Sequence, residues 1–334
     1  MVSEGKDDGE GSGVGMTRDA PSSPQRRPVP GTGEPVQRAA LCALLLVATT
    51  LAAGGAGAQE LEARAYRTLP TGLNFVILAY RFSSGNVVTD PTLPIENLQV
   101  DLQVPTLGYL RSFGMFGRSA SLSASVPFAF MSGSAVYNGE PIADSRSGSA
   151  DTRLRLAVNL IGGPALSPAE FARYQQGRNL GVSLTVSAPT GQYDPTRLIN
   201  FGNNRWGFKP EVGYSSIRGP WIYELAAGAW FFTDNGDYLG ATKSQDPIGS
   251  LQANISYNFK SGVWIALNGN WFTGGKTAID GVPKDDLQKN SRVGLTVSTP
   301  LGGPHSLKLS AQTGAYTASG ADFDEFTVAY QYRW

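Results

Sequence analysis

The stretch that most constrains the fold is the end of the chain, residues 322–334, which reads DFDEFTVAYQYRW. A β-strand places successive side chains on opposite faces, so Phe326, Val328, Tyr330, Tyr332 and Trp334 share one apolar face. In a soluble sheet, such an exposed edge strand invites aggregation, which proteins avoid. In a transmembrane β-barrel, the same pattern places one face against lipid, the other toward the lumen, and aromatic side chains at the membrane boundary.

The composition agrees with a barrel and argues against a nucleic-acid binder. The formal net charge is zero and charged residues make up 16% of the chain, whereas binding to nucleic acid needs a basic surplus. Hydrophobic residues make up 41%, which suits a barrel because only alternate residues of each strand meet lipid.

An apolar run precedes the region of alternating residues. Residues 39–53 read AALCALLLVATTLAA, which is shorter than the ~20 residues of a spanning helix. Arg38 stands before the run and Ala56-Gly57-Ala58 after it, so residues 38–58 are predicted to be a signal peptide cleaved before Gln59. The alternative is a short anchor helix. The single cysteine, Cys42, lies inside the run, and the mature chain therefore has no disulfide framework.

Residues 1–37 are rich in Gly, Ser, Pro and charge and cannot build a core. Because such a tail is unusual before a signal peptide, these residues are interpreted as a disordered or mis-annotated extension, with the true start near Val36. Residues 59–334 contain no run of 18 apolar residues, which excludes a transmembrane helix there.

Segments of alternating residues recur through this mature region and predict twelve antiparallel strands of an up-and-down barrel. They lie near 72–84, 96–111, 118–132, 149–162, 178–189, 204–217, 220–233, 248–260, 262–273, 289–300, 305–317 and 323–334. The first of them is apolar on both faces, so its orientation stays open.

The connections between these segments alternate in length. The short ones are 113–117, 219, 261 and 301–304, and the long, acid-rich ones are 85–95, 133–148, 190–203, 234–247, 274–288 and 318–322. The connection 163–177 breaks the rule, and Ser167, Pro168 and Glu170 predict a short helix in it. Short periplasmic turns and long outer loops are typical of outer-membrane barrels, and an even strand number places both termini on the periplasmic side. Soluble β-sandwiches and β-propellers would not separate short from long connections in this way.

Three segments carry a resemblance to a known family. They are residues 188–214 (APTGQYDPTRLINFGNNRWGFKPEVGY), 153–171 (RLRLAVNLIGGPALSPAEF) and 230–235 (WFFTDN). In them the chain resembles a family of bacterial outer-membrane proteins labelled "putative MetA-pathway of phenol degradation" and described as transporters. The resemblance implies an outer-membrane barrel that admits aromatic or other hydrophobic compounds, and it implies no catalytic residues.

Candidate catalytic and metal motifs are weak. A serine-histidine lipid hydrolase needs a histidine at the outer rim, but His305, the single histidine, follows Gly302-Gly303-Pro304 in a predicted periplasmic turn. Gly275-Lys276-Thr277 lacks the first glycine of a P-loop. Asp234-Asn235-Gly236-Asp237 lacks the full ligand series of a calcium loop and is interpreted as an acidic turn. No metal or cofactor is expected.

Charged side chains on the predicted inner faces are the candidates for a role in permeation, because a charge on the lipid face at mid-bilayer costs roughly 2–4 kcal/mol. They are Arg153, Arg155, Lys209, Glu211, Glu224, Arg292, Lys308, Glu325 and Arg333. Two interpretations stay open: a network of acids and bases that fills the lumen, or a charged constriction that selects solutes. Trp230, Trp264 and Phe272 are inward aromatic candidates that either line a path or pack.

The sequence therefore predicts an outer-membrane barrel of a Gram-negative bacterium that acts as a channel or passive transporter for small molecules and is not an enzyme. The alternatives are a non-conducting structural or surface-interaction barrel and, less favoured, an outer-membrane lipid hydrolase. Expected partners are outer-membrane lipid and lipopolysaccharide, the solute, and the barrel-assembly machinery. The closing strand resembles the C-terminal signal read by that machinery, although Trp334 replaces the commoner terminal Phe.

Overall fold

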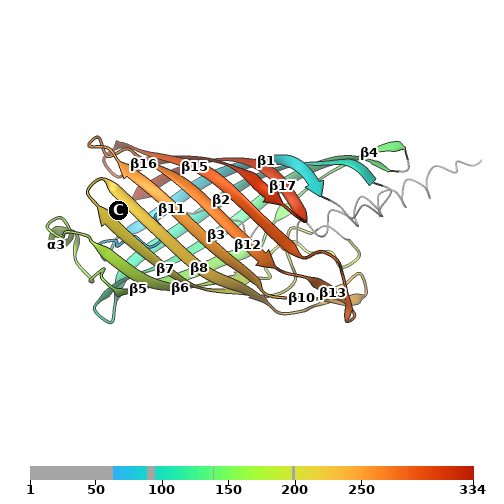
Figure 1. Ribbon diagram of the computed structural model, residues 1–334, viewed down its shortest axis with the longest axis horizontal. Coiled ribbons are helices and arrows are strands. Elements are labelled where there is room, and N and C mark those ends of the chain that lie inside the picture. Colours follow the sequence, from blue (N-terminus) through green and yellow to red (C-terminus); the bar gives the residue numbers. More distant parts are fainter. Residues whose placement is uncertain (1–62, 89–94, 138, 198–199) are drawn as a thin grey trace, which may run out of the picture.

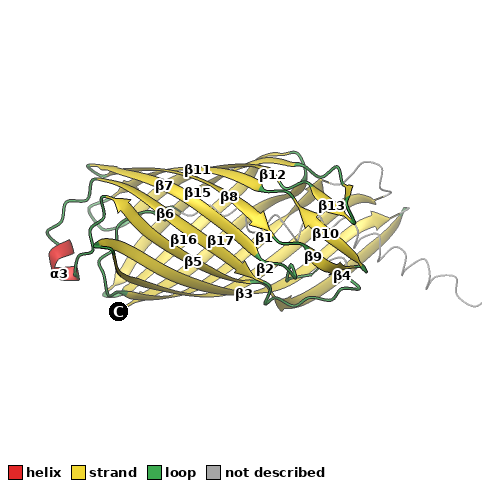
Figure 2. Ribbon diagram, turned by 90° about the horizontal axis from the view of Figure 1, so that it is seen from below, coloured by secondary structure: helices red, strands yellow, loops and turns green. Residues whose placement is uncertain are grey.

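The computed structural model describes residues 63–88, 95–137, 139–197 and 200–334, and its strands form a closed antiparallel barrel of twelve strands (Figures 1 and 2). The barrel strands are β1 Asn74–Val88, β2 Ile95–Met115, β3 Arg118–Tyr137, β5 Thr152–Ile161, β6 Arg178–Ala188, β7 Gly207–Arg218, β8 Trp221–Phe232, β11 Ile248–Asn258, β12 Trp264–Gly274, β15 Gln288–Gly302, β16 His305–Thr317 and β17 Gly320–Arg333. The predicted fold class and strand number are thereby confirmed.

The last strand closes the barrel against the first. β17 pairs antiparallel with β1, with Phe75 opposite Arg333 and Phe82 opposite Phe326. Beyond the ladder, the Asn74 N–H donates to the Trp334 carbonyl at 2.9 Å, and the Trp334 N–H donates to the Asn74 carbonyl at 3.1 Å. The final residue of the chain therefore completes the seam.

The two ends of the barrel differ, as the alternation of connection lengths predicts. One end, here the turn end, carries the tight turns, the C-terminus and the connection with helix α3 (Pro168–Phe171) (Figure 1). The other, the loop end, carries β4 (Glu140–Ser149), which extends the wall beside β3, and a small sheet of β9 Asn235–Tyr238, β10 Ala241–Gln245, β13 Thr277–Ile279 and β14 Val282–Pro283.

Residues 133–148, expected as a long loop, are largely strand. β3 continues to Tyr137 and pairs with β4 from Phe128 opposite Ser149 to Tyr137 opposite Glu140. The expectation was wrong because this hairpin, at the loop end, consists mostly of Ser, Gly, Ala and Asp, without the apolar alternation that marks a strand facing lipid. Similarly, β17 begins at Gly320, inside the expected 318–322 loop.

The outer surface of the barrel is apolar at mid-height. Side chains there are between a third and two thirds exposed, among them Leu78, Leu107, Val126, Leu154, Val212, Leu225, Leu267 and Leu295. Phe326 and Tyr332 of β17 and the following Trp334 are exposed on this face, whereas Ala329 of the opposite face is 4% exposed. A belt of this kind is buried only by lipid, so the barrel is a transmembrane one.

The expected helix in the 163–177 connection exists and is short. Ser167 is the N-cap of α3, its hydroxyl and the Glu170 side chain form a capping box, and Pro168 opens the helix. Two orphan N–H groups of the first turn are thereby satisfied. Among the described residues, no helix has the length and apolarity needed to cross a membrane. The predicted signal peptide (38–58) and N-terminal extension (1–37) lie outside the described residues.

Candidate functional site in the barrel lumen

The described chain begins inside the barrel. Residues 63–73, here the N-terminal segment, precede β1, and Tyr66 and Thr68 in it are 5% and 1% exposed. Tyr66 contacts Ser183, and Thr68 accepts a 2.6 Å hydrogen bond from the Asn179 amide. Because Ser183 and Asn179 are inward-facing residues near the turn end of β6, the segment occupies the lumen in that half of the barrel.

The Tyr66 hydroxyl is held at the centre of a charged cluster. It donates to Glu211 Oε1 at 2.7 Å and lies 2.9 Å from Ser183 Oγ. Glu211 also forms an ion pair of 2.6 Å with Lys209, and Arg155 lies 3.9 Å away. The Arg155 guanidinium sits 5.1 Å from the centre of the Tyr66 ring. The cluster therefore joins the N-terminal segment to β5, β6 and β7.

The absence of a side chain at Gly213 makes room for the Tyr66 ring. A Cβ atom at this position would lie 2.1 Å from Tyr66 Cδ2, far closer than two carbon atoms can approach. Gly213 has the ordinary extended backbone of β7, so its small size rather than its conformational freedom is what the site requires.

Arg64 fixes the start of the segment to β8, β11 and β12, the strands that follow β7 around the barrel. Its backbone N–H donates to Glu224 Oε2 at 2.6 Å and its guanidinium donates to Asn258 Oδ1 at 2.7 Å. The guanidinium also lies 3.9 Å from the centre of the Trp264 ring, a geometry for cation–π attraction. Trp264, a candidate for lining a path, thus holds the N-terminal segment.

The end of the segment is bonded to the turns. Ser119 Oγ donates to the Leu69 carbonyl at 2.8 Å and Ser112 Oγ donates to the Pro70 carbonyl at 2.6 Å. The Thr71 N–H donates to the Leu166 carbonyl at 2.8 Å. The connection with α3, which interrupts the regular alternation of turn lengths, therefore supports the N-terminal segment. No periodic pattern marks residues 63–71, so nothing in the sequence predicts that they enter the lumen.

All nine charged candidates from the sequence lie on inward-facing strand positions. Arg153, Arg155, Lys209, Glu211 and Glu224 lie on β5, β7 and β8, and Arg292, Lys308, Glu325 and Arg333 lie on β15, β16 and β17. In the second group, Arg292 lies 3.6 Å from Glu325 and donates to the Phe323 carbonyl at 2.8 Å. Their part in permeation stays a prediction.

Arg81 is an inward-facing charge that sequence reasoning missed. It lies opposite Val104 of β2, which is 4% exposed, and opposite Thr327 of β17. The first strand is apolar on both faces, so alternation gave no signal for its orientation. The orientation of β1 follows from its pairing with β17, whose inward and outward faces the sequence does predict.

Trp230 and Phe272 pack rather than line an open path. They are 3% and 0% exposed and form one cluster with Ile248, against which Phe232 packs. The apolar cluster lies near the loop end, where β8 and β12 end and β11 begins. Phe232 stacks on Trp230 at 6.1 Å and receives the Arg205 guanidinium at 4.5 Å from its centre.

The small sheet at the loop end buries a second basic residue. Lys243 of β10 is 6% exposed and its ammonium lies 4.8 Å from the centre of the Tyr238 ring. Burial, aided by the nearby Arg205, lowers the pKa of Lys243 to about 8, although Asp286 opposes the shift. Burial likewise lowers the pKa of Arg205 to about 10. Asp286 accepts two hydrogen bonds from Thr277.

His305 lies at the turn end on the lipid side of the wall. It stands opposite Tyr332, an outward-facing residue, and its Nδ1 is 2.6 Å from the Tyr330 hydroxyl. This position is remote from the loop end. Among the described residues, no group of three His, Cys, Asp or Glu side chains is placed to hold a metal ion.

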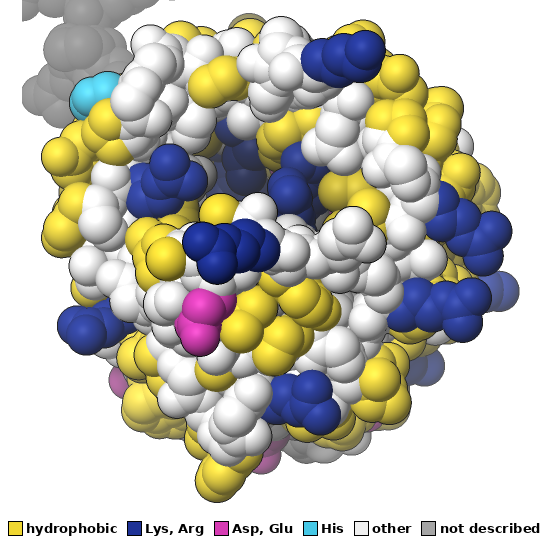
Figure 3. Space-filling model, turned by 90° about the vertical axis from the view of Figure 1, so that its left-hand side faces the viewer, with side chains coloured by type: hydrophobic (Ala, Val, Ile, Leu, Met, Phe, Trp, Pro, Cys, Tyr) yellow, Lys and Arg dark blue, Asp and Glu magenta, His cyan; other side chains and the backbone are white. Residues whose placement is uncertain are grey.

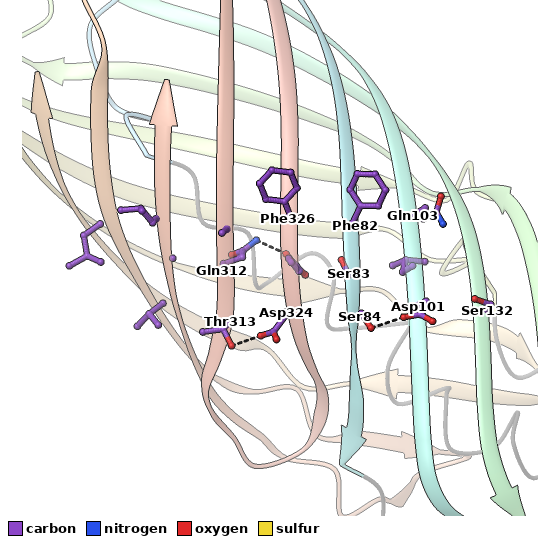
Figure 4. A pocket seen from close by; sticks show the side chains of 17 residues that line it. Phe82, Ser83, Ser84, Asp101, Gln103, Ser132, Gln312, Thr313, Asp324 and Phe326 are labelled. Atoms are coloured by element: carbon purple, nitrogen blue, oxygen red, sulfur yellow. Dashed lines mark hydrogen bonds between the residues drawn. The ribbon is translucent and has the colours of Figure 1, made fainter. Parts of the chain in front are cut away.

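A groove of about 770 Å³ lies on the outer wall near the loop end (Figure 4). Phe82 and Phe326 form its apolar edge, and the pairs Thr313–Asp324 and Ser84–Asp101, bonded at 2.5 and 2.6 Å, lie nearer the loop end. Outward-facing residues here change from apolar to polar within two positions, from Phe326 to Asp324 on β17 and from Phe82 to Ser84 on β1. The groove therefore marks the loop-end edge of the lipid-facing belt.

The fold, the apolar belt and the polar interior define the class: a transmembrane β-barrel of the outer-membrane type. Residues 81–331 match the model of the family described as "Putative MetA-pathway of phenol degradation", and the chain belongs to this family. The resemblance seen in the sequence is thereby confirmed.

A solved structure shares the fold. An outer membrane channel from Pseudomonas putida F1 is 21% identical, covers 82% of this chain and 100% of its own, and superposes with a TM-score of 0.69. Lower likenesses are the KdgM porin, with 10% identity, coverage of 77% and 98% and a TM-score of 0.42, and the transport unit of the autotransporter AIDA-I from Escherichia coli, with 11% identity, coverage of 85% and 94% and a TM-score of 0.47. No curated protein sequence matches the chain.

Proposed function

We propose that the protein is an outer-membrane channel for the passive passage of small molecules, among them aromatic or other hydrophobic compounds. The observation that carries this proposal is the closed barrel of twelve strands with an apolar outside and a lumen lined by charged and amide side chains. The description of the family and the similarity of the fold to an outer membrane channel from Pseudomonas putida F1 support it. The turn end is proposed to face the periplasm, together with the C-terminus.

The lumen is narrow, which favours selective over general passage. A barrel of ~12 strands is wider than the eight-strand barrels that side chains fill and narrower than porins with ~16 strands. The N-terminal segment narrows it further. A solute must therefore pass beside this segment or displace it. The few contacts that hold the segment in place then determine how readily a solute crosses the barrel.

A non-conducting structural barrel is a second candidate, because the N-terminal segment occupies the turn-end half of the lumen. Planar-bilayer recording separates the two functions. Purified, folded protein is expected to carry ionic current, and vesicles that contain it are expected to take up a small aromatic solute faster than empty vesicles. Absence of both current and uptake, in the wild-type protein and in a variant with a released N-terminal segment, would overturn the channel proposal.

The proposal that the protein is not an enzyme rests on the position of His305. Its Nδ1 bonds to the phenol of Tyr330 on the lipid side of the turn end, so no hydroxyl nucleophile of the loop-end rim is within its reach. Hydrolysis of phospholipid that disappears in His305→Ala would contradict this assignment.

A further inference from the structure

The inward-facing side chains of the barrel strands carry more basic than acidic groups. Register and burial place seven basic residues inward: Arg81, Arg153, Arg155, Lys209, Arg292, Lys308 and Arg333. The acids on inward-facing positions of the same strands are Glu211, Glu224 and Glu325. In the extension of the wall, β4 adds Asp144 and Arg146, which lie 3.6 Å apart, and Glu140 on the same face at its loop-end tip. The described N-terminal segment adds Arg64 and Arg67 and no acid.

Each of the three acids is engaged by a donor of this same set or of the N-terminal segment. Glu211 lies within ion-pair distance of both Lys209 and Arg155. Glu325 lies 3.6 Å from Arg292. Glu224 accepts the Arg64 backbone N–H, and the Arg64 and Arg67 side chains supply positive charge close to it. The negative charge of the lumen is therefore matched locally, and the positive charge is in excess.

Part of the excess positive charge is concentrated in one sector of the inner surface, on β1 and β16. Arg81 of β1 stands opposite Thr327, and Lys308 of β16 stands opposite Ala329, two residues further along β17. The two cations thus flank a stretch of β17 with small inward side chains. Within the described chain, neither side chain makes a hydrogen bond or an ion pair.

The turn end of the barrel also carries more positive than negative charge. Figure 3 faces this end: Lys and Arg side chains surround a central hollow and lie within it, and a single patch of acid faces the viewer. The turns and the strand ends beside them contribute Arg118, Arg173, Arg178, Arg218 and Lys260, against Glu170. Carboxylates gather instead on the loops of the other end, including Asp234, Asp237, Asp280, Asp285 and Asp286.

The two sets of charges do not act equally on a permeating ion. Charges on exposed loops are screened by salt beyond ~8 Å at physiological ionic strength, whereas charges inside a narrow passage with low-dielectric walls are screened much less. Rings of Arg and Lys side chains select anions in other pores. The acidic loops lower the local concentration of anions at the mouth, but the inner charges determine which ion crosses.

We propose that the lumen prefers anions, and that the solutes of the channel are small molecules that carry a carboxylate or a similar negative group on an apolar or aromatic body. The inference rests on the proposed function, since selectivity requires a barrel that conducts. It adds the sign of the solute's charge, which neither the family description nor the fold supplies.

The test is the reversal potential of single channels in a planar bilayer with a KCl gradient. A permeability for chloride several-fold above that for potassium is expected, and replacement of chloride by benzoate is expected to leave a current carried by the aromatic anion. Equal permeabilities, or a preference for potassium, would overturn the inference while leaving the channel function intact. No current from the wild-type protein or from Gly213→Ala would instead overturn the channel function, and the inference with it.

Two variants, each lacking one inward positive charge, test whether the anion preference arises from the lining of the lumen. Lys308→Gln and Arg81→Gln each remove one inward charge that no ion pair uses, so the fold should be kept while the chloride preference falls. Lys289→Gln is the matched control, because Lys289 is exposed and adjoins the inward-facing Asn290 on β15. An equal fall in Lys289→Gln and Lys308→Gln would show that net charge, rather than the lining of the lumen, sets the preference.

Discussion

The Tyr66 phenol donates a 2.7 Å hydrogen bond to the Glu211 carboxylate, and this bond joins the segment before the first strand to the wall of the barrel. Glu211 is at the same time the partner of Lys209 and Arg155. One carboxylate therefore balances the charge of the lumen and holds the element that narrows it. Passage and electrostatics are coupled at this residue.

Removing the Tyr66 hydroxyl should release the N-terminal segment more often. A hydrogen bond to a charged group contributes about 1.5–3 kcal/mol, and 1.4 kcal/mol corresponds to about a tenfold change in an equilibrium constant. In Tyr66→Phe, the population of the more open state should rise about tenfold or more, seen as a larger mean current in planar bilayers. Tyr214→Phe, on the outer face, is the control and should conduct like the wild-type protein.

Gly213→Ala should have the same effect by a different route. The added Cβ would collide with the Tyr66 ring, while alanine itself suits a strand slightly better than glycine. The barrel should therefore fold normally and the current should rise. Gly269→Ala, where the added Cβ has no neighbour closer than 4.0 Å, should leave the current unchanged. A Gly213→Ala current equal to that of Gly269→Ala would mean that the segment does not limit passage.

The sequence predicts the strands and their faces where one side of the strand contacts lipid, and it predicts them poorly elsewhere. Alternation across the membrane predicts β17 and its faces, because an apolar side must meet lipid. It fails for residues 133–137 and for β4 at the loop end, where the strands lack that apolar alternation. It also fails for Arg81, whose strand is apolar on both faces. The contacts of Arg64 and Tyr66 join residues more than a hundred positions apart, and no local pattern encodes them.

The assignment of faces predicts an asymmetry between two neighbours on β17. Val328→Arg puts a charge on the lipid side, at a cost of roughly 2–4 kcal/mol at mid-bilayer and less near its edges. Thr327→Arg puts the same side chain toward the lumen, where water solvates it and repulsion from Arg81 on the opposite position of β1 costs up to about 1 kcal/mol. The free energy of unfolding in lipid vesicles, measured with urea, should therefore fall more in Val328→Arg, and equal losses would invert the faces.

The small sheet at the loop end should become more stable as the pH is raised above about 8. The pKa of Lys243 is lowered to about 8 in the folded protein, whereas an unfolded lysine titrates near ~10.4. Between these values the unfolded chain binds more protons, so the free energy of unfolding rises with pH there and is flat with respect to this group below. In Lys243→Met, this rise in the urea midpoint between about pH 8 and pH 10 should be absent, and Lys289→Met should keep it.

Deleting Trp334 should impair assembly of the barrel more than conduction through it. The residue exchanges two backbone hydrogen bonds with Asn74 at the seam, and its ring stacks on Tyr332 at 5.7 Å and lies 6.4 Å from Tyr109 of β2. All of these contacts lie at the rim or on the outer face, away from the lumen. The truncated chain should therefore yield less folded protein in outer membranes, judged by heat-modifiable migration in gels. Those barrels that do form should show the unit conductance of the wild-type protein.

Trp334→Phe, which keeps the backbone pairing and an aromatic ring, should assemble normally. A lowered unit conductance with undiminished assembly would mean that the terminal residue acts on the lumen and not on closure.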